Sequence, residues 1–108
     1  MVTFALSPES YGLVTGEMGR SIGRAHGLTV GAAEWQALQR AERSGGRYVV
    51  TCDEHAAMFL LEWFERSFEV AKTGHGLFGE PSSVLSGCRR ASAAIRAALV
   101  SSPPQRPA

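Results

Sequence analysis

The most compact group of reactive side chains is the run Cys52-Asp53-Glu54-His55, which precedes a long helical pattern. A cysteine at a helix N-terminus has a lowered pKa and enhanced reactivity, so Cys52 is the candidate nucleophile of a small enzyme. His55 could act as its base only if the turn folds the ring back, because side chains at i and i+3 share a helix face. The two acids would instead raise the pKa of the thiol, and they suit the first turn of a helix. The sequence therefore favours a capping role for this run, with no catalytic residue and no enzyme activity.

The three histidines, His26, His55 and His75, are the candidate metal ligands. Together with Asp53 they could hold a metal ion if folding brought them close. No pair has a ligand spacing such as H-x-x-x-H, and histidines at helix ends more often interact with the helix dipole. The two cysteines are far apart in the sequence, which indicates neither a metal knuckle nor a disulfide framework. We predict no metal, no cofactor and reduced thiols.

Residues 19–41 resemble a helix-turn-helix in outline, with Gly27 in the turn and residues 44–50 as a wing behind it. Arginines would contact phosphates, and a glutamine could reach base edges. Against this hypothesis, the second helix carries Glu34 and Glu42 and the net charge is only +1, whereas DNA-binding domains are usually basic. DNA binding is therefore the alternative function, and its candidate residues are Arg24, Gln36, Arg40, Arg43 and Arg47.

A long helix is predicted from about Cys52 to Thr73, and the rest of the chain is organised around it. Thr51 and Glu54 fit a capping box at its start. Successive residues turn by roughly 100°, which separates an apolar face from a charged face. The charged face includes Glu62 and Arg66 as a favourable i,i+4 pair. The apolar face consists of Ala57, Leu60, Leu61, Phe64, Phe68 and Ala71.

A shoulder beside this apolar face widens it to about half the circumference, whereas a helix packed on one neighbour needs an arc of about 100°. One interpretation is that several elements of the same chain cover the shoulder. The other is an interface with a second copy or a partner protein, because large aromatic residues are enriched at interfaces. The interface residues in this second interpretation are Phe59, Trp63 and Val70.

The N-terminal part predicts a strand at Val2–Leu6, an N-cap at Ser7 and a glycine-rich helix over residues 9–25 that ends at His26-Gly27. Each helical glycine lowers helix stability by about 1 kcal/mol relative to alanine, so another interaction must offset this loss of stability. We favour close packing of another backbone; a broken helix and the approach of a ligand are the alternatives. The glycines are Gly12, Gly16, Gly19 and Gly23.

The remaining pattern predicts a second helix from about Gly31 to Ser44, a strand at Arg47–Thr51 and a last helix over Val84–Val100, reached through a glycine-rich loop at residues 73–81. The predicted order is β-α-α-β-α-α. Two strands alone form a marginal sheet, and a dimer that joined two such pairs would relieve this. On the last helix, Arg89, Arg90 and Arg96 face outward, where they could match the acidic face of the central helix.

Length and composition predict one globular domain over residues 1–100 and a disordered proline-rich tail over residues 101–108. The net charge of +1 provides no field that would attract nucleic acid or an anionic membrane. The N-terminus lacks a basic segment followed by an apolar run, which predicts no secretory signal and a cytoplasmic location. We therefore expect a small α+β domain that is a non-enzymatic protein-interaction or regulatory module, acts as a homodimer or with a protein partner, and does not enter a membrane.

Overall fold

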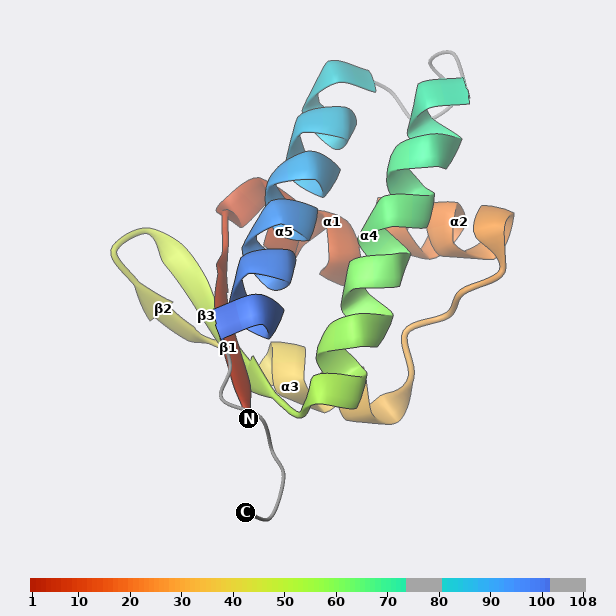
Figure 1. Ribbon diagram of the computed structural model, residues 1–108. Coiled ribbons are helices and arrows are strands. Elements are labelled where there is room, and N and C mark those ends of the chain that lie inside the picture. Colours follow the sequence, from red (N-terminus) through yellow and green to blue (C-terminus); the bar gives the residue numbers. More distant parts are fainter. Residues whose placement is uncertain (74–80, 102–108) are drawn as a thin grey trace.

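The computed structural model describes residues 1–73 and 81–101. Within these ranges the chain forms an α+β fold, the predicted class, in which a long central helix packs against the last one (Figure 1). The elements are β1 (Val2–Leu6), α1 (Pro8–Thr15), α2 (Glu17–His26), α3 (Ala32–Gln39), β2 (Glu42–Ser44), β3 (Arg47–Cys52), α4 (Glu54–Thr73) and α5 (Pro81–Ser101).

The sheet has the strand order β1-β3-β2, and both pairs are antiparallel. Alternate residues of β1 and β3 point to opposite faces, as the period of two requires. On the outer face, the hydroxyl oxygens of Thr3 and Thr51 lie 3.1 Å apart, and both residues are exposed. The inner face is buried and contributes Val2, Phe4, Leu6, Val50 and Cys52 to the core.

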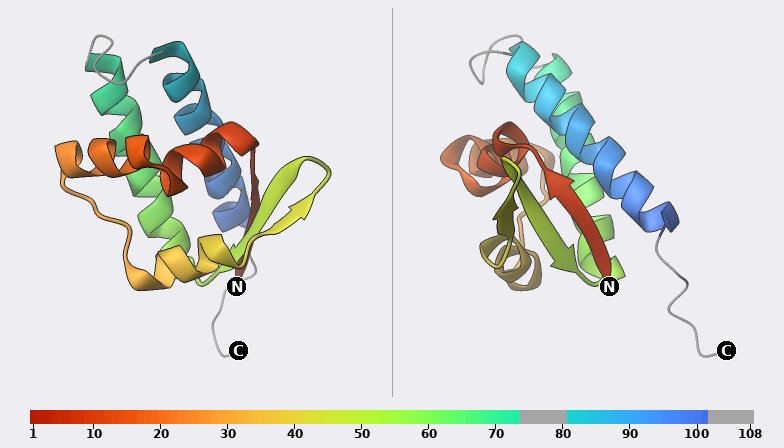
Figure 2. Two further views of the ribbon diagram at one scale, coloured as in Figure 1. Left: turned by 180° about the vertical axis from the view of Figure 1, so that it is seen from behind. Right: turned by 90° about the vertical axis from the view of Figure 1, so that its left-hand side faces the viewer.

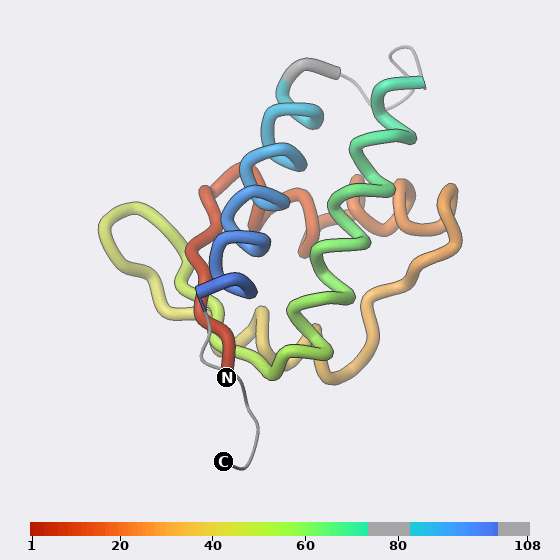
Figure 3. Tube along the Cα trace, in the orientation of Figure 1, coloured from red at the N-terminus to blue at the C-terminus, as the bar shows by residue number. Residues whose placement is uncertain are grey.

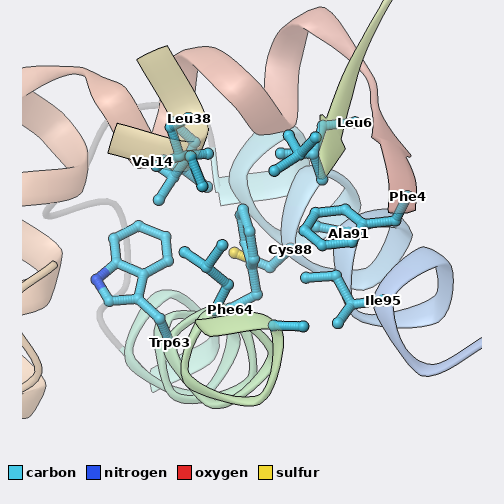
Figure 4. Close-up of a cluster of buried hydrophobic side chains, with 14 of the residues drawn as sticks. Phe4, Leu6, Val14, Leu38, Trp63, Phe64, Cys88, Ala91 and Ile95 are labelled. Atoms are coloured by element: carbon cyan, nitrogen blue, oxygen red, sulfur yellow. The ribbon is translucent and has the colours of Figure 1, made fainter. Parts of the chain in front are cut away.

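Helices α4 and α5 run antiparallel and side by side (Figures 1 and 2). The C-terminal half of α5 passes along β1, so the two ends of the described chain lie close together (Figure 3). Helices α2 and α3 each pack on α4, whereas α1 packs on α5. The core fills the space between these layers (Figure 4), with Phe64 and Leu60 of α4 and Ile95 of α5 completely buried.

Two hydrogen bonds, one buried and one partly buried, attach α1 to its neighbours. The hydroxyl of Ser10, which is fully buried, donates to the carbonyl oxygen of Gly87 on α5 at 2.7 Å. The hydroxyl of Tyr11 donates to the carbonyl oxygen of Leu38 on α3 at 2.7 Å, and its ring stacks on Tyr48 with a centroid distance of 3.9 Å. These contacts connect α1 with α5, α3 and β3, and they set the position of α2, which follows α1 directly.

Three predictions about local structure are wrong. The helix predicted to reach Ser44 ends at Gln39, because the next residues pair with β3 as β2. Gly45 and Gly46 have φ of 57° and 77°, as a two-residue hairpin loop requires. The predicted two strands are therefore three in the described residues. The continuous N-terminal helix that we favoured is broken at Gly16, which is extended, so it forms α1 and α2, as the broken-helix alternative had it.

The cap of α4 is the third error. Thr51 lies within β3, and Asp53 caps the helix instead: its Oδ1 accepts a hydrogen bond from the Ala56 N–H at 2.7 Å. The sequence indicated the right place but the wrong residue, because β3 continues to Cys52 before the helix can begin.

Several local predictions are confirmed. Ser7 caps α1 by accepting from the Ser10 N–H at 3.2 Å, and α2 ends at Gly27, which has a φ of 83°. On α4, Arg66 donates to Glu62 at 2.7 Å, and Arg96 of α5 forms the expected ion pair with the acidic side of α4 through Glu65.

Parts of two predictions lie outside the described residues. The first is the glycine-rich loop, most of which, with His75, is not described. The second is the tail at 101–108, of which only Ser101 is described, as the last residue of α5. Among the helices that the structure describes, none combines the length and apolar character needed to cross a membrane.

Candidate functional site

Trp63 lies at the centre of the most distinctive packing in the molecule. Its side chain is only 1% exposed, because α2 crosses the shoulder of α4 directly over the indole. A Cβ added at Gly19 would come within 3.3 Å of Trp63 Cη2, and one added at Gly23 within 3.2 Å of Trp63 Nε1. The same added atoms would overlap the Leu13 carbonyl oxygen at Gly19 and approach the Leu28 carbonyl oxygen to 2.8 Å at Gly23. Close packing therefore explains these two glycines, as we favoured from the sequence.

His26 secures the end of α2 to α4 beside this indole. Its Nδ1 accepts a hydrogen bond from the Leu28 N–H at 3.3 Å, so the proton of the neutral ring is on Nε2, which donates to the buried Ser67 hydroxyl at 2.9 Å. The ring also meets the Trp63 indole edge to face, with centroids 5.8 Å apart. Burial, and then the nearby Arg66 guanidinium, lower the pKa of His26. The fold is thus built around the neutral imidazole.

We expect acid to weaken this attachment. The lowered pKa means that the unfolded chain binds a proton at His26 more readily than the folded chain does. The free energy of unfolding should therefore fall as pH drops below about 6.5, the ordinary pKa of histidine. Urea denaturation of the wild type and of His26→Gln between pH 5 and 8 measures this contribution. The exposed His55→Gln is the control, and a His26→Gln protein with the pH dependence of the wild type would contradict the assignment.

A cavity of about 410 Å³ opens beside the indole, between α2, the residues that follow it, α3 and α4. This volume lies within the range of about 300–1,000 Å³ that is usual for small-molecule sites. The walls are mainly apolar side chains and glycine backbone. The lining residues are Val14, Gly19, Arg20, Gly23, Arg24, Leu28, Thr29, Val30, Trp35 and Trp63.

Polar groups face this cavity in a defined arrangement. Figure 4 shows the nitrogen edge of Trp63 turned away from the other labelled side chains, and within the described residues no fully buried side-chain nitrogen lacks a hydrogen-bond partner. Arg20 and Arg24 supply positive charge, and neither forms an ion pair with a carboxylate in residues 1–73 or 81–101. Arg24 has only a long contact of 3.5 Å with the Ser21 hydroxyl. The cavity therefore combines apolar walls with hydrogen-bond donors and positive charge.

The predicted interface residues do not form one open surface. Trp63 belongs to the core, and Phe59 and Val70 on the same side of α4 are half-buried. The position of Trp63 matches the interpretation that elements of the same chain cover the shoulder. Trp63, the largest of the predicted interface side chains, is thus covered by α2 and lines a pocket.

The predicted DNA-contacting residues are exposed but are not arranged as a helix-turn-helix. Helices α2 and α3 run in opposite directions and are joined by residues 27–31 (Figure 2). Helix α2 packs on α4 and α1, and α3 packs on α4 and β3, rather than on each other. Arg24 lies beside the pocket, whereas Arg43 and Arg47 lie on the β2–β3 hairpin. Gln36 is on α3 and Arg40 directly follows it. A recognition helix held by a partner helix is therefore not formed.

The run from Cys52 to His55 is divided between two elements. Cys52 is buried at the end of β3, and burial, followed by the charges of Asp53 and Glu34, raises the pKa of its thiol to about 11. His55 is exposed in the first turn of α4. His26 contacts Ser67, about 18 Å further along the helix axis at 1.5 Å per residue, so the two histidines do not share a site.

Both cysteines should react slowly with iodoacetamide at pH 7 in the folded protein and rapidly in urea. Burial raises the pKa of Cys88 to about 12, so both thiols are almost entirely protonated at neutral pH, and the thiolate is the reactive form. Mass spectrometry of the alkylated chain, with and without urea, measures the difference. Rapid native labelling at Cys52 alone would instead support a nucleophile.

Sequence reasoning missed the pocket residues Arg20, Leu28, Val30 and Trp35. The available signal was the glycine pair Gly19 and Gly23, one turn apart on a helix that also carries Arg20 and Arg24 one turn apart. That pattern indicates a face of α2 that another group approaches closely. It could not identify Trp63 as that group.

No known protein family, curated protein or solved structure matches this chain, so the candidate site rests on its own geometry.

Proposed function

We propose that this chain is a small non-enzymatic binding module and that its binding site is the pocket beside Trp63. The observation that carries the proposal is the buried indole of Trp63, which lines a largely apolar cavity of about 410 Å³. A ligand that enters the pocket would cover the apolar walls and could accept a hydrogen bond from the indole N–H.

The lining suits binding better than chemistry. The groups that face the cavity are apolar side chains, hydrogen-bond donors and two guanidinium groups, which cannot act as general bases. The thiols lie elsewhere, buried and protonated. These features support a module that retains or senses a ligand rather than one that transforms it.

The two tryptophans of the chain, Trp35 and Trp63, both line the pocket, so intrinsic fluorescence reports directly on its contents. The test uses N-phenyl-1-naphthylamine, a neutral dye that brightens in apolar surroundings. We expect saturable binding of one dye per chain, with quenching of the tryptophan emission by energy transfer.

Thr29→Phe should fill the mouth of the pocket and weaken dye binding, because Thr29 is exposed and lies on the lining. Thr3→Phe is the matched control, since Thr3 is exposed on the outer face of the sheet. Absence of saturable binding, or equal binding by the Thr29→Phe variant, would overturn the proposed site.

A further inference from the structure

We propose that the ligand of this pocket is a small organic anion, with an apolar body and one acidic group such as a carboxylate or a phosphate. This inference rests on the proposed binding function and specifies the chemistry that the site selects. It depends on three features of the described residues: the apolar walls, the two arginines on α2 and the indole N–H.

The walls define the apolar body of the ligand. Leu28 and Val30 come from the segment between α2 and α3, Val14 from α1, and the two indoles from α3 and α4. Gly19 and Gly23 also line the cavity, and they let α2 pack closely against the Trp63 ring. Such a surface favours an aromatic or branched aliphatic group, as in most small-molecule sites.

The arginines define the charge. Arg20 and Arg24 are four residues apart on α2, so they are neighbours on its surface, and like charges at this spacing destabilise a helix. The last turn of a helix favours a cation, which accounts for Arg24 but not for Arg20 in the middle of α2. Among the described residues that line the pocket, none is acidic and could neutralise them. An anionic group at this rim would relieve the repulsion and gain charge-assisted hydrogen bonds.

The indole N–H adds a third, directional contact. Trp63 lines the pocket, so an oxygen of the ligand could accept a hydrogen bond from this N–H. Cationic ligands would meet two like charges at the rim and a donor inside. Neutral ligands could gain the apolar contact and the indole hydrogen bond, but not the attraction to the two arginines. The site thus ranks anions above neutral molecules of the same shape, and neutral molecules above cations.

Three isosteric probes test this ranking: phenylacetate, phenylacetamide and phenethylammonium. The measurement is titration of the ¹⁵N-labelled protein, followed through the indole N–H signals, which Trp35→Phe assigns. We expect phenylacetate to shift the Trp63 signal and to bind at least about tenfold more tightly than the amide, with the ammonium weakest. Raising the salt concentration should reduce this preference, because exposed charges are screened.

The variant pair Arg20→Gln and Arg24→Gln, combined in one protein, should abolish the preference for phenylacetate over phenylacetamide. Both residues are exposed, so the fold is expected to remain intact. Arg47→Gln is the control, because Arg47 is also exposed but lies on the hairpin, away from the pocket. This variant also removes a positive charge, and it should preserve the preference for phenylacetate.

Equal affinity for the acid and the amide, or a preference that persists in the double variant, would overturn the anion assignment and leave the pocket itself standing. Failure of all three probes to shift the Trp63 signal, together with failure of the neutral dye to bind, would overturn the proposed function as well.

Discussion

Trp63→Ala should lower the free energy of unfolding by about 3–5 kcal/mol, the usual cost of removing a fully buried Trp or Phe side chain. The side chain is 1% exposed and packs edge to face on Phe64, with ring centroids 5.1 Å apart, and against the glycines of α2. Small domains have only about 5–15 kcal/mol of stability, so the loss is a large fraction of the total. Urea denaturation followed by circular dichroism measures it.

Trp35→Ala is the matched control, because Trp35 is only half-buried and should cost clearly less. Trp63→Phe, which keeps a ring in the core, should fall between the two. Equal losses for Trp63→Ala and Trp35→Ala would show that the indole is not a central part of the fold.

The same variant tests self-association, which stays a prediction from the sequence. If Trp63 acts only within its own chain, the stability loss should not depend on protein concentration, since only a coupled dimer makes stability concentration-dependent. Light scattering of the wild type and of Phe59→Ala then examines the half-buried part of α4 that remains available to a second copy. A dimer that Phe59→Ala dissociates would support the interface at that residue.

Gly19→Ala should destabilise the protein by about 1–3 kcal/mol, although alanine is the better helix former. The added Cβ would overlap the carbonyl oxygen of Leu13 and press on the Trp63 ring. Leu13 belongs to α1, which is held to α5 and α3 by the hydrogen bonds of Ser10 and Tyr11. The clash is with backbone, so it can be relieved only by moving α1 relative to α2.

Gly12→Ala makes the same substitution where nothing lies within 4 Å of the new Cβ. It should stabilise the protein by about 0.5–1 kcal/mol, because Gly12 is inside α1 and pays the entropy cost of a helical glycine. The two variants are thus expected to have opposite signs. Thermal denaturation measures both, and a stabilised Gly19→Ala protein would contradict the close packing of α2 on α4.

Gly16 and β2 show why some local structure could not be predicted from the sequence. The segment up to Gly23 has continuous helical spacing, and the break at Gly16 arises because α1 and α2 must each pack on a different partner, α5 and α4. The residues Glu42–Ser44 carry no β-branched or aromatic side chain, and they become a strand because the Gly45-Gly46 turn places them beside β3. In both places tertiary contacts override the local preference.

The sequence by itself determined the features that depend on residues within one or two turns of each other. These include the Ser7 cap, the end of α2 at Gly27, the apolar face of α4 and the Glu62–Arg66 pair. It also determined the fold class, because the helical and strand periodicities are strong in β1, β3, α4 and α5. These features depend on residues that are close together in the sequence, so the sequence alone is enough to predict them.

Only the tertiary structure decided what covers Trp63. The indole of Trp63 and the two glycines that pack against it, Gly19 and Gly23, are roughly forty residues apart in the sequence, and no periodicity connects them. From the sequence, the same tryptophan could belong to the core or to an open interface, because both bury a large aromatic side chain. The crossing of α2 over α4 made it core, placed it beside a cavity and brought Arg20 and Arg24 to the rim, and that arrangement is the physical basis of the proposed site.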